Sequence, residues 1–228
     1  VYLSGGDNGK VIIYDIEKLQ KLDSISLDGK INGVDFQHSL TSDLLLNPDE
    51  NELLVLDAGN FRFVRIDLAT KKLTASIKVG RQPFGIALSP DKKQAFVANV
   101  GLYSYPLITG ATPHNLNDLM ISHHPYGNNT PESVNGTLVE GKQMPGLGSP
   151  NHQDAMSVFT IDLDKNTVIN KFKTGYLIGE TVEDAEVVGG ASPNSIAVGK
   201  QFAYVTNATN DNITIIDHTT QEIVGHIP

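Results

Sequence analysis

The chain has 228 residues, a formal net charge of −9 at pH 7 and no cysteine. The acidic balance argues against a nucleic-acid-binding protein, which needs a basic surface. The lack of cysteine excludes disulfides, thiolate nucleophiles, cysteine-ligated zinc sites and covalently attached c-type haem. No apolar stretch approaches the roughly 18 residues of a membrane-spanning helix, and the length fits one all-β domain or at most two small ones.

A phrase of two predicted strands recurs four times along the chain. Its first strand is written YLSG, LVLD, FVAN or YVTN, and these runs end at Gly5, Asp57, Asn99 and Asn207. Its second strand always ends in aspartate, at Asp15, Asp67, Asp162 and Asp217. The two strand ends are ten residues apart in the first, second and fourth copies. In the third copy their separation is longer by 53 residues. The sequence therefore predicts a repeat with one large insertion.

Two further strands flank each phrase. The segment RQPFGIALSPDKKQAFVAN parallels GASPNSIAVGKQFAYVTN, with Pro83 matching Pro193, and segments such as DLATKKLTASIKVG follow the aspartate. The unit is thus four short strands, a to d, in about 40 residues. Strands such as ITIID are apolar on both faces. This is unusual for an antiparallel sheet with one solvent-exposed face, but it is expected for sheets that are stacked face to face. This pattern predicts an all-β protein, a β-propeller of four-stranded antiparallel blades.

In chain order, the repeat places a partial blade in residues 1–28, a blade in 41–80, a blade in 81–175 with an inserted loop at 101–155, and a blade in 190–228. Propellers usually close with about four to eight blades. We therefore expect these blades and part-blades to be a segment of a larger propeller. The remaining blades would belong to the same parent protein or to another chain, and association of copies through the open blade edges is a weaker alternative.

The polar residues that end the strands are interpreted as turn residues. We expect Asn99 and Asn207 to close strand b, with side chains that bond to the backbone of the following turn. The aspartates that end strand c would open the c–d turn in the same way. Because one such aspartate lies on each separate blade, they do not form a carboxylate cluster.

The stretches PFGIALSPDKKQAFVAN and PNSIAVGKQFAYVTN…ITIID resemble the YVTN repeat family of β-propellers, over about two-thirds of the chain. This resemblance implies an exported protein that is periplasmic, secreted or on the cell surface. In addition, VYLSGGDNGKVIIYD, GKQMPGLGSPN…SVFTIDL and VGGASPNSIAV resemble proteins in which such a propeller precedes an alkaline-phosphatase-superfamily phosphoesterase domain. No stretch here resembles that domain, so the resemblance implies that any catalysis lies outside this chain.

The long connections are expected on one side of the molecule. In an antiparallel blade, the b–c and d–a connections emerge at the same end, and the long segments 28–40, 101–155 and 176–189 are all of these two kinds. Loop length concentrated on one rim of a rigid scaffold usually marks a binding surface. We therefore predict that this long-loop face binds a partner protein or a neighbouring domain, through Tyr103, Tyr105, His123, His124, Tyr126, Glu183 and Asp184.

The insertion also holds four of the seven histidines. Two imidazoles and a carboxylate would suit a divalent metal, and the candidate ligands are His114, Asp118, His123, His124, His152 and Asp154. Against this, adjacent histidines normally point apart and no HExxH spacing occurs, so an ordered polar loop without a cofactor is the preferred interpretation. The acidic run ETVEDAE lacks the alternating oxygen ligands of a calcium loop and is interpreted as a solvated face.

Three functions follow from these observations. The first is a non-catalytic scaffold that binds a partner or a neighbouring domain through the long-loop face. The second is the substrate-access part of a phosphoesterase whose catalytic domain lies elsewhere, which only the resemblance implies. The third is a metal-binding propeller like that of nitrous-oxide reductase, although its histidines would have to recur once per blade instead of clustering in one insertion. No nucleophile arrangement or phosphate-loop order is present.

Overall fold

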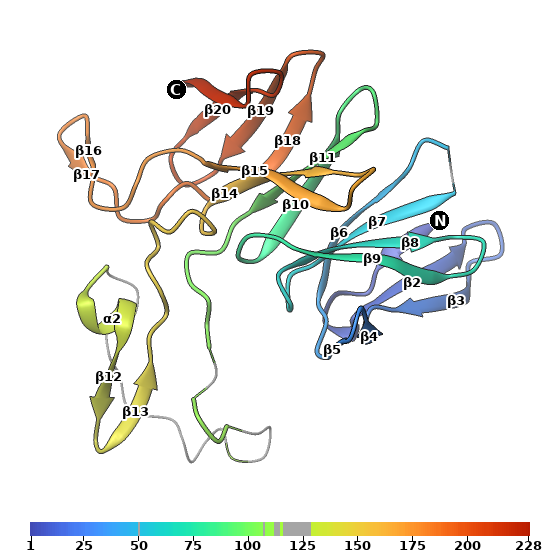
Figure 1. Cartoon of the computed structure of the whole chain (residues 1–228), viewed down its shortest axis with the longest axis horizontal. Coiled ribbons are helices and arrows are strands. Elements are labelled where there is room, and N and C mark those ends of the chain that lie inside the picture. Colours follow the sequence, from blue (N-terminus) through green and yellow to red (C-terminus); the bar gives the residue numbers. More distant parts are fainter. Residues whose placement is uncertain (50, 107, 112–114, 116–128) are drawn as a thin grey trace.

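The computed structural model describes residues 1–49, 51–106, 108–111, 115 and 129–228. Four sheets, here called blades 1 to 4, follow the four repeats (Figure 1). Blade 1 has three strands, β1 (Tyr2–Ser4), β2 (Lys10–Asp15) and β3 (Gln20–Ser26). The others have four strands: β6 (Thr41–Leu46), β7 (Glu52–Asp57), β8 (Arg62–Asp67) and β9 (Lys72–Lys78); β10 (Pro83–Leu88), β11 (Gln94–Asn99), β14 (Ser157–Asp162) and β15 (Thr167–Lys173); and β18 (Pro193–Val198), β19 (Phe202–Asn207), β20 (Asn212–Asp217) and β21 (Glu222–Ile227).

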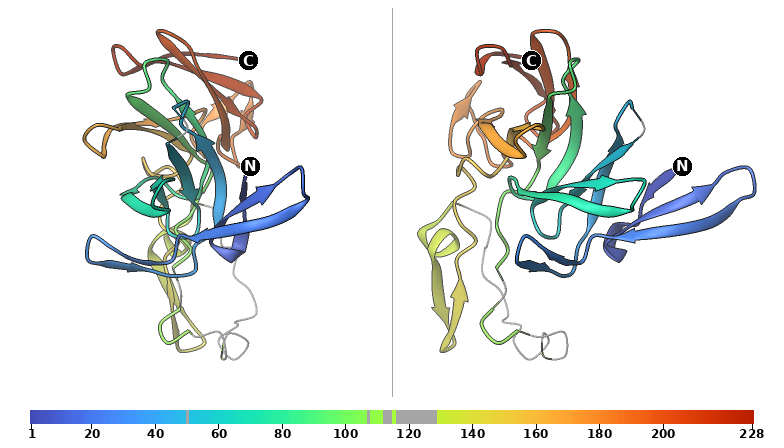
Figure 2. Two further views of the ribbon diagram at one scale, coloured as in Figure 1. Left: turned by 90° about the vertical axis from the view of Figure 1, so that its right-hand side faces the viewer. Right: turned by 45° about the vertical axis from the view of Figure 1, so that its right-hand side comes forward.

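All neighbouring strands in these blades are antiparallel, and their order in each sheet is their order in the chain. The blades fan out from the side on which β6, β10 and β18 lie next to one another (Figures 1 and 2). This arrangement confirms the predicted fold of stacked four-stranded antiparallel sheets. Among the described residues, no helix is long and apolar enough to cross a membrane.

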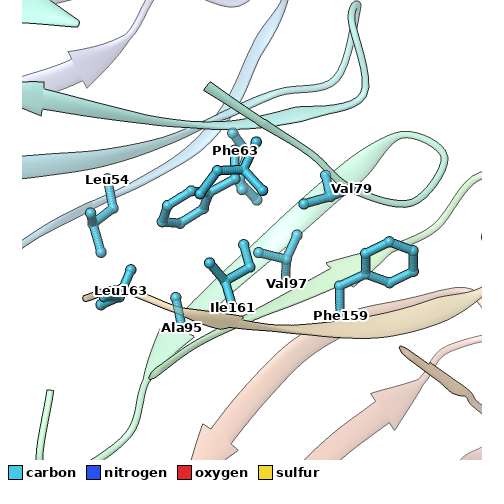
Figure 3. Close-up of a cluster of buried hydrophobic side chains, with 10 residues drawn as sticks. Leu54, Phe63, Val79, Ala95, Val97, Phe159, Ile161 and Leu163 are labelled. Carbon is cyan, nitrogen blue, oxygen red and sulfur yellow. The ribbon is translucent and has the colours of Figure 1, made fainter. Parts of the chain in front are cut away.

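In the described part of the chain, the core consists of three apolar clusters, one between each pair of neighbouring blades. Between blades 2 and 3, Leu54 and Phe63 of one sheet face Val97 and Phe159 of the other (Figure 3). Alternate residues of a strand point to opposite faces, so Val55 packs instead in the cluster with blade 1. Each fully buried side chain of this kind contributes about 1.5–3 kcal/mol. This double burial is the reason why the strands are apolar on both faces.

The inner strands of the blades, β6, β10 and β18, each contain a β-bulge near their start. The register shifts between Thr41 and Leu44 in β6, and the same irregularity occurs near the start of β10 and of β18. Gly85 follows the bulge in β10, and a Cβ atom there would lie 2.4 Å from the carbonyl oxygen of Asn194 in β18. Glycine at this position therefore allows β10 and β18 to come together.

The predicted role of the strand-c aspartates is confirmed. The Oδ1 atom of Asp162 accepts hydrogen bonds from the backbone N–H groups of Lys165 and Asp164, at 2.9 and 3.0 Å. These bonds, first that from Lys165, hold the pKa of the Asp162 carboxyl below its ordinary value. Asp15 and Asp217 accept the same two backbone bonds, and Asp67 accepts one, from the N–H of Thr70. The pKa of all three carboxyls is lowered in the same direction.

The predicted role of the strand-b asparagines is wrong. Asn99 and Asn207 are buried, and their side-chain amides donate across to strand c instead of to the turn. Asn99 Nδ2 donates to the carbonyl oxygen of Ser157 at 3.2 Å, and Asn207 Nδ2 donates to Asn212 Oδ1 at 2.7 Å. In each case the acceptor belongs to the residue directly opposite in the ladder. Burial favours this arrangement, because an inward-facing amide needs a partner inside the sheet.

Three excursions leave the same end of the blades. They carry the hairpin β4 (Gly29–Ile31) and β5 (Val34–Phe36), the segment α2 (Pro131–Asn135), β12 (Gly136–Val139) and β13 (Lys142–Pro145), and the hairpin β16 (Thr181–Val182) and β17 (Ala185–Glu186). A short 3-10 helix, η1 (Gly6–Asn8), lies between β1 and β2. Figure 1 shows the three excursions at the lower and left ends of the sheets, opposite the turns that follow β6, β10 and β18.

Candidate functional site

The long-loop face contains a pocket of about 500 Å³ between blades 2 and 3, here called the rim pocket. It is formed by the beginnings of β6 and β10, the turn between β7 and β8, and the chain just after β11. Its lining residues are Leu40, Ser42, Ala58, Gly59, Phe61, Gln82, Pro83, Phe84, Val100, Ser104 and Tyr105. A concave site of this size lies within the range of known ligand and side-chain pockets.

The backbone of the pocket wall is unusual at three points. Phe61, Gln82 and Tyr105 have positive φ angles of 52°, 47° and 45°, a conformation that few residues other than glycine adopt. Gln82 comes directly before the bulge of β10, and the bulge leaves Phe84 52% exposed. Ser42 Oγ, from the corresponding bulge in β6, donates a 2.7 Å hydrogen bond to the carbonyl oxygen of Pro83. The bulges of β6 and β10 thus form one wall of the rim pocket.

The rim pocket is apolar and almost without charge. Three large hydrophobic side chains around it are well exposed: Leu40 at 40%, Phe84 at 52% and Tyr105 at 54%. The phenol of Tyr105 is the single ionisable side chain among its lining residues, although the whole chain carries a net charge of −9. The side-chain amide of Gln82 makes no hydrogen bond within the part of the chain that the structure describes. The group that best matches the lining of the rim pocket is uncharged and has one polar edge.

Of the three tyrosines predicted for this face, the two that the structure describes, Tyr103 and Tyr105, have different environments. Tyr105 is exposed at the pocket, whereas Tyr103 is only 5% exposed. Their rings meet edge to face with centroids 5.9 Å apart, a favourable geometry for aromatic pairs. Burial, with a smaller contribution from Tyr105, raises the pKa of the Tyr103 phenol. Tyr103 therefore supports Tyr105 from inside, and Tyr105 is the member of the pair that a partner can touch.

Two cations, the buried Arg81 and the partly buried Lys173, hold the base of the insertion against the blades. Arg81 Nη1 donates to the carbonyl oxygens of Leu102 and Ser149, which belong to the outgoing and returning segments of the insertion. Lys173 Nζ donates to the carbonyl oxygens of Pro150 and Ala155, at 2.9 and 2.6 Å. Burial and, less strongly, the charge of Arg81 lower the pKa of Lys173 to about 8. The segment that bears Tyr105 is thus fixed at both ends.

The remaining predicted residues are not brought together by the described part of the structure. His114, Asp118, His123, His124 and Tyr126 lie outside the described residues. The predictions about them therefore stay predictions.

His152 and Asp154 are described, and the Nδ1 atom of His152 accepts a 3.2 Å hydrogen bond from the backbone N–H of Asp154. The carboxylate of Asp154 pairs with Lys171 at 2.8 Å. Within the described ranges, no group of three histidine, aspartate or glutamate side chains has a metal-binding arrangement. Glu183 and Asp184 are exposed in the turn between β16 and β17 and do not line the rim pocket.

Sequence reasoning missed the residue that most distinguishes this pocket, Phe84. A signal for it was present: Phe84 follows Pro83, whereas the matching residue after Pro193 is Asn194. A large aromatic residue at a bulge, where another repeat has a small polar one, indicates a special environment. The other pocket residues come from turns, in which no hydrophobic period identifies the exposed positions.

A second hollow, of about 390 Å³, lies on the opposite side of blades 2 and 3. It is strongly polar, and its principal charges already have partners. Arg65 donates two hydrogen bonds to the carboxylate of Glu52, at 2.7 and 2.9 Å. An ion pair closed on itself in this way leaves little unmet charge for a ligand, so the rim pocket is the stronger candidate.

No family model and no curated protein matches the chain. Solved structures do match it. Hydrazine synthase from Kuenenia stuttgartiensis is 16% identical with a TM-score of 0.57, over 99% of this chain and 44% of that one. Selenomethionine-substituted virginiamycin B lyase from Staphylococcus aureus is 13% identical with a TM-score of 0.56, over 100% of this chain and 51% of that one.

This chain therefore spans about half the length of these two structures. Both are propeller-type folds, and together with the antiparallel blades they establish a β-propeller architecture for the chain. At identities this low, the likeness concerns the fold alone. Function has to be argued from the surface of this molecule.

Proposed function

We propose that the protein is a non-catalytic β-propeller scaffold that binds a protein partner or a neighbouring domain through its long-loop face. The observation that carries the proposal is the rim pocket, where Leu40, Phe84 and Tyr105 are exposed around one concave surface. Contiguous exposed apolar groups with a polar surround are typical of interaction sites. The rim pocket would receive an uncharged apolar side chain of the partner, and Tyr105 and Gln82 would contact its polar edge.

The location of the pocket supports a macromolecular partner. It lies at the base of the large insertion, and the β4–β5 and β16–β17 hairpins leave the same end of the blades. A side chain anchored in the pocket would therefore bring the rest of its protein against these excursions. Phenylalanine and tyrosine, as at positions 84 and 105, are enriched in protein interfaces, and tyrosine is enriched among the residues that dominate binding energy. The YVTN-like repeats further support a place outside the cytoplasm, in the periplasm, in the medium or on the cell surface.

Peptide display on the purified chain tests the proposal. Peptides selected on the wild type should carry an uncharged aromatic or aliphatic anchor. Their affinity should fall at least tenfold on Phe84→Asn, which places the residue of the matching repeat at this bulge, and on Tyr105→Ser. The control is Leu138→Ser, because Leu138 is 66% exposed on β12 and does not line the pocket. Unchanged binding to both pocket variants would count against the proposal.

A second candidate function is that of an access domain for a phosphoesterase. It is supported by the likeness of VYLSGGDNGKVIIYD and VGGASPNSIAV to propellers that precede such a domain. In that case the long-loop face would contact the catalytic domain. Sequencing the encoding gene beyond the codon for Pro228 tests this candidate, because the catalytic domain requires several further aspartate and histidine metal ligands.

A further inference from the structure

Three asparagines of the chain are followed directly by glycine, in the pairs Asn8–Gly9, Asn32–Gly33 and Asn135–Gly136. In such a pair the backbone nitrogen of the glycine can attack the side-chain amide of the asparagine, because glycine has no Cβ atom to hinder the close approach. All three asparagines are exposed to solvent. The dipeptide alone therefore gives the three sites the same reactivity, and their surroundings in the fold decide which one reacts.

Two of the pairs are held firmly. Gly9 is buried, and its N–H donates to the carbonyl oxygen of Gly6 at 3.1 Å. A Cβ atom on Gly9 would lie 2.7 Å from the carbonyl oxygen of Ser39. The N–H of Gly136 donates to the carbonyl oxygen of Glu132 at the end of α2, and a Cβ atom here would lie 2.4 Å from another backbone carbonyl oxygen. In both places the glycine nitrogen already has a partner, and packed backbone limits how far its peptide can turn.

Asn32 and Gly33 are held differently, because they form the tip of the β4–β5 hairpin (Figure 1). Their φ angles are 52° and 85°, as in the type I′ turn that asparagine and glycine favour between two strands. Within the described residues, neither the N–H of Gly33 nor the side-chain amide of Asn32 makes a hydrogen bond. Nothing lies within 4 Å of a Cβ atom built on Gly33. The nitrogen that would attack is therefore free at this tip.

The hairpin also opens easily. Its strands have three residues each, they pair from Ile31 with Val34 to Gly29 with Phe36, and they form a separate two-stranded sheet. A two-stranded hairpin is only marginally stable by itself, and segments of this kind open locally at a small part of the free energy of global unfolding. Opening is required, because the tight turn has to relax before the Gly33 nitrogen can reach the side-chain carbon of the preceding residue.

We propose that Asn32 is a site of spontaneous deamidation that reacts ahead of the other two Asn–Gly pairs. The backbone nitrogen of Gly33 bonds to Cγ of Asn32 and loses its proton. The bond between Cγ and Nδ2 breaks, and the side-chain nitrogen leaves with this proton as ammonia. One water molecule then opens the five-membered imide. Aspartate forms if the bond between Cγ and the Gly33 nitrogen breaks, and isoaspartate forms if the backbone carbonyl carbon is released instead.

The modification changes both the charge and the shape of the hairpin tip. Either product has a carboxylate in place of a neutral amide, on one of the three excursions of the long-loop face. Isoaspartate also lengthens the main chain by one carbon, which does not fit the two-residue turn between Ile31 and Val34. These changes do not depend on what the rim pocket binds.

Peptide mapping by mass spectrometry of the whole chain, aged in mildly alkaline buffer, tests the proposal. Deamidation replaces a side-chain NH2 by OH, so the modified peptide is heavier, and fragmentation identifies the asparagine and distinguishes aspartate from isoaspartate. In the folded protein, Asn32 should be converted about tenfold faster than Asn8 and Asn135, because a hairpin tip opens at a lower free-energy cost than packed backbone. The matched control is the chain aged in urea, where the three pairs should react at similar rates.

Equal rates at the three sites in the folded protein would overturn the proposal. So would an Asn32 that reacts in urea and stays unmodified in the folded chain, because the turn would then protect it. Gly33→Ala, compared with the wild type in urea, identifies the attacking atom. The added Cβ atom should slow the reaction at Asn32 and leave Asn8 and Asn135 unchanged. An unchanged rate at Asn32 would contradict attack by the Gly33 nitrogen.

Discussion

Arg62 and Asp57 form a buried ion pair in blade 2, with Arg62 Nε 2.7 Å from Asp57 Oδ2 and side chains that are 1% and 0% exposed. The same guanidinium donates to the carbonyl oxygen of Leu27 at 2.6 Å and lies 3.8 Å from the centre of the Phe36 ring. Asp57 Oδ1 accepts from the backbone N–H of Leu40 at 2.9 Å. The pair therefore fixes the 28–40 excursion to blade 2 and sets one wall of the rim pocket.

Replacing Asp57 by asparagine should destabilise the protein strongly. The substitution removes the counter-charge of a guanidinium that stays buried, and breaking one side of such a pair costs about 3–5 kcal/mol. The free energy of unfolding in urea measures the loss. A cost below about 1 kcal/mol would show that the neighbouring carbonyl and hydroxyl groups satisfy Arg62 by themselves.

The double variant Asp57→Asn/Arg62→Asn provides the matched control, since it copies the pair Asn207 and Asn212 that blade 4 has in this place. The two substitutions should not be additive, and a coupling energy of about 1–3 kcal/mol is expected. If the double variant is destabilised by the full sum of the two single effects, the two positions do not act as one unit.

Gly85→Ala should weaken the contact between the inner strands. A Cβ atom at this position would lie 2.4 Å from the carbonyl oxygen of Asn194, which is a backbone atom that cannot rotate away. Overpacking of this kind costs about 1–3 kcal/mol. Gly225→Ala is the control, because nothing lies within 4 Å of a Cβ atom there and the residue is also in a strand. Thermal unfolding should separate the two, and equal melting temperatures would contradict the packing argument.

The stacked blades and the aspartate turns could be predicted from the sequence because both depend on local patterns. An apolar run that ends in aspartate specifies its own turn bonds, as at Asp162. The different environments of Tyr103 and Tyr105 could not be predicted, since an irregular insertion has no period to separate inward from outward positions. The Arg62–Asp57 pair was missed as well, because its partners come from a segment more than twenty residues earlier.

Asp217→Asn should make the protein less stable at neutral pH and should change the response to acid. Hydrogen bonds from the side chains of Thr219 and Gln201, in that order, hold the pKa of the Asp217 carboxyl far below its ordinary value. A lowered folded-state pKa gives stability that is complete above the unfolded pKa, near 4, and is lost as the pH falls toward the folded value. The difference in melting temperature between wild type and variant should therefore shrink from pH 7 to pH 3. Asp184→Asn, in the exposed hairpin turn, is the control, and a constant difference for Asp217→Asn would contradict the assignment.

Lys173 should give the protein a stability that rises in mildly alkaline solution. Its folded-state pKa is about 8 against an ordinary 10.5, because burial and the charge of Arg81 disfavour the ammonium form. The folded protein therefore releases this proton first as the pH rises. The cost of burying the charge is fully present below pH 8 and disappears between about pH 8 and 10.5.

The measurement is the free energy of unfolding of wild type minus that of Lys173→Met, taken at pH 7 and at pH 9 in the same buffer. Titration of other groups cancels in this difference, which should increase by about 1 kcal/mol from pH 7 to pH 9. Lys165→Met serves as the control, because the Lys165 side chain is 74% exposed, and its difference should not change with pH. A difference for Lys173→Met that is equal at both pH values would mean that water or the surrounding carbonyl oxygens solvate the ammonium as well as bulk solvent does.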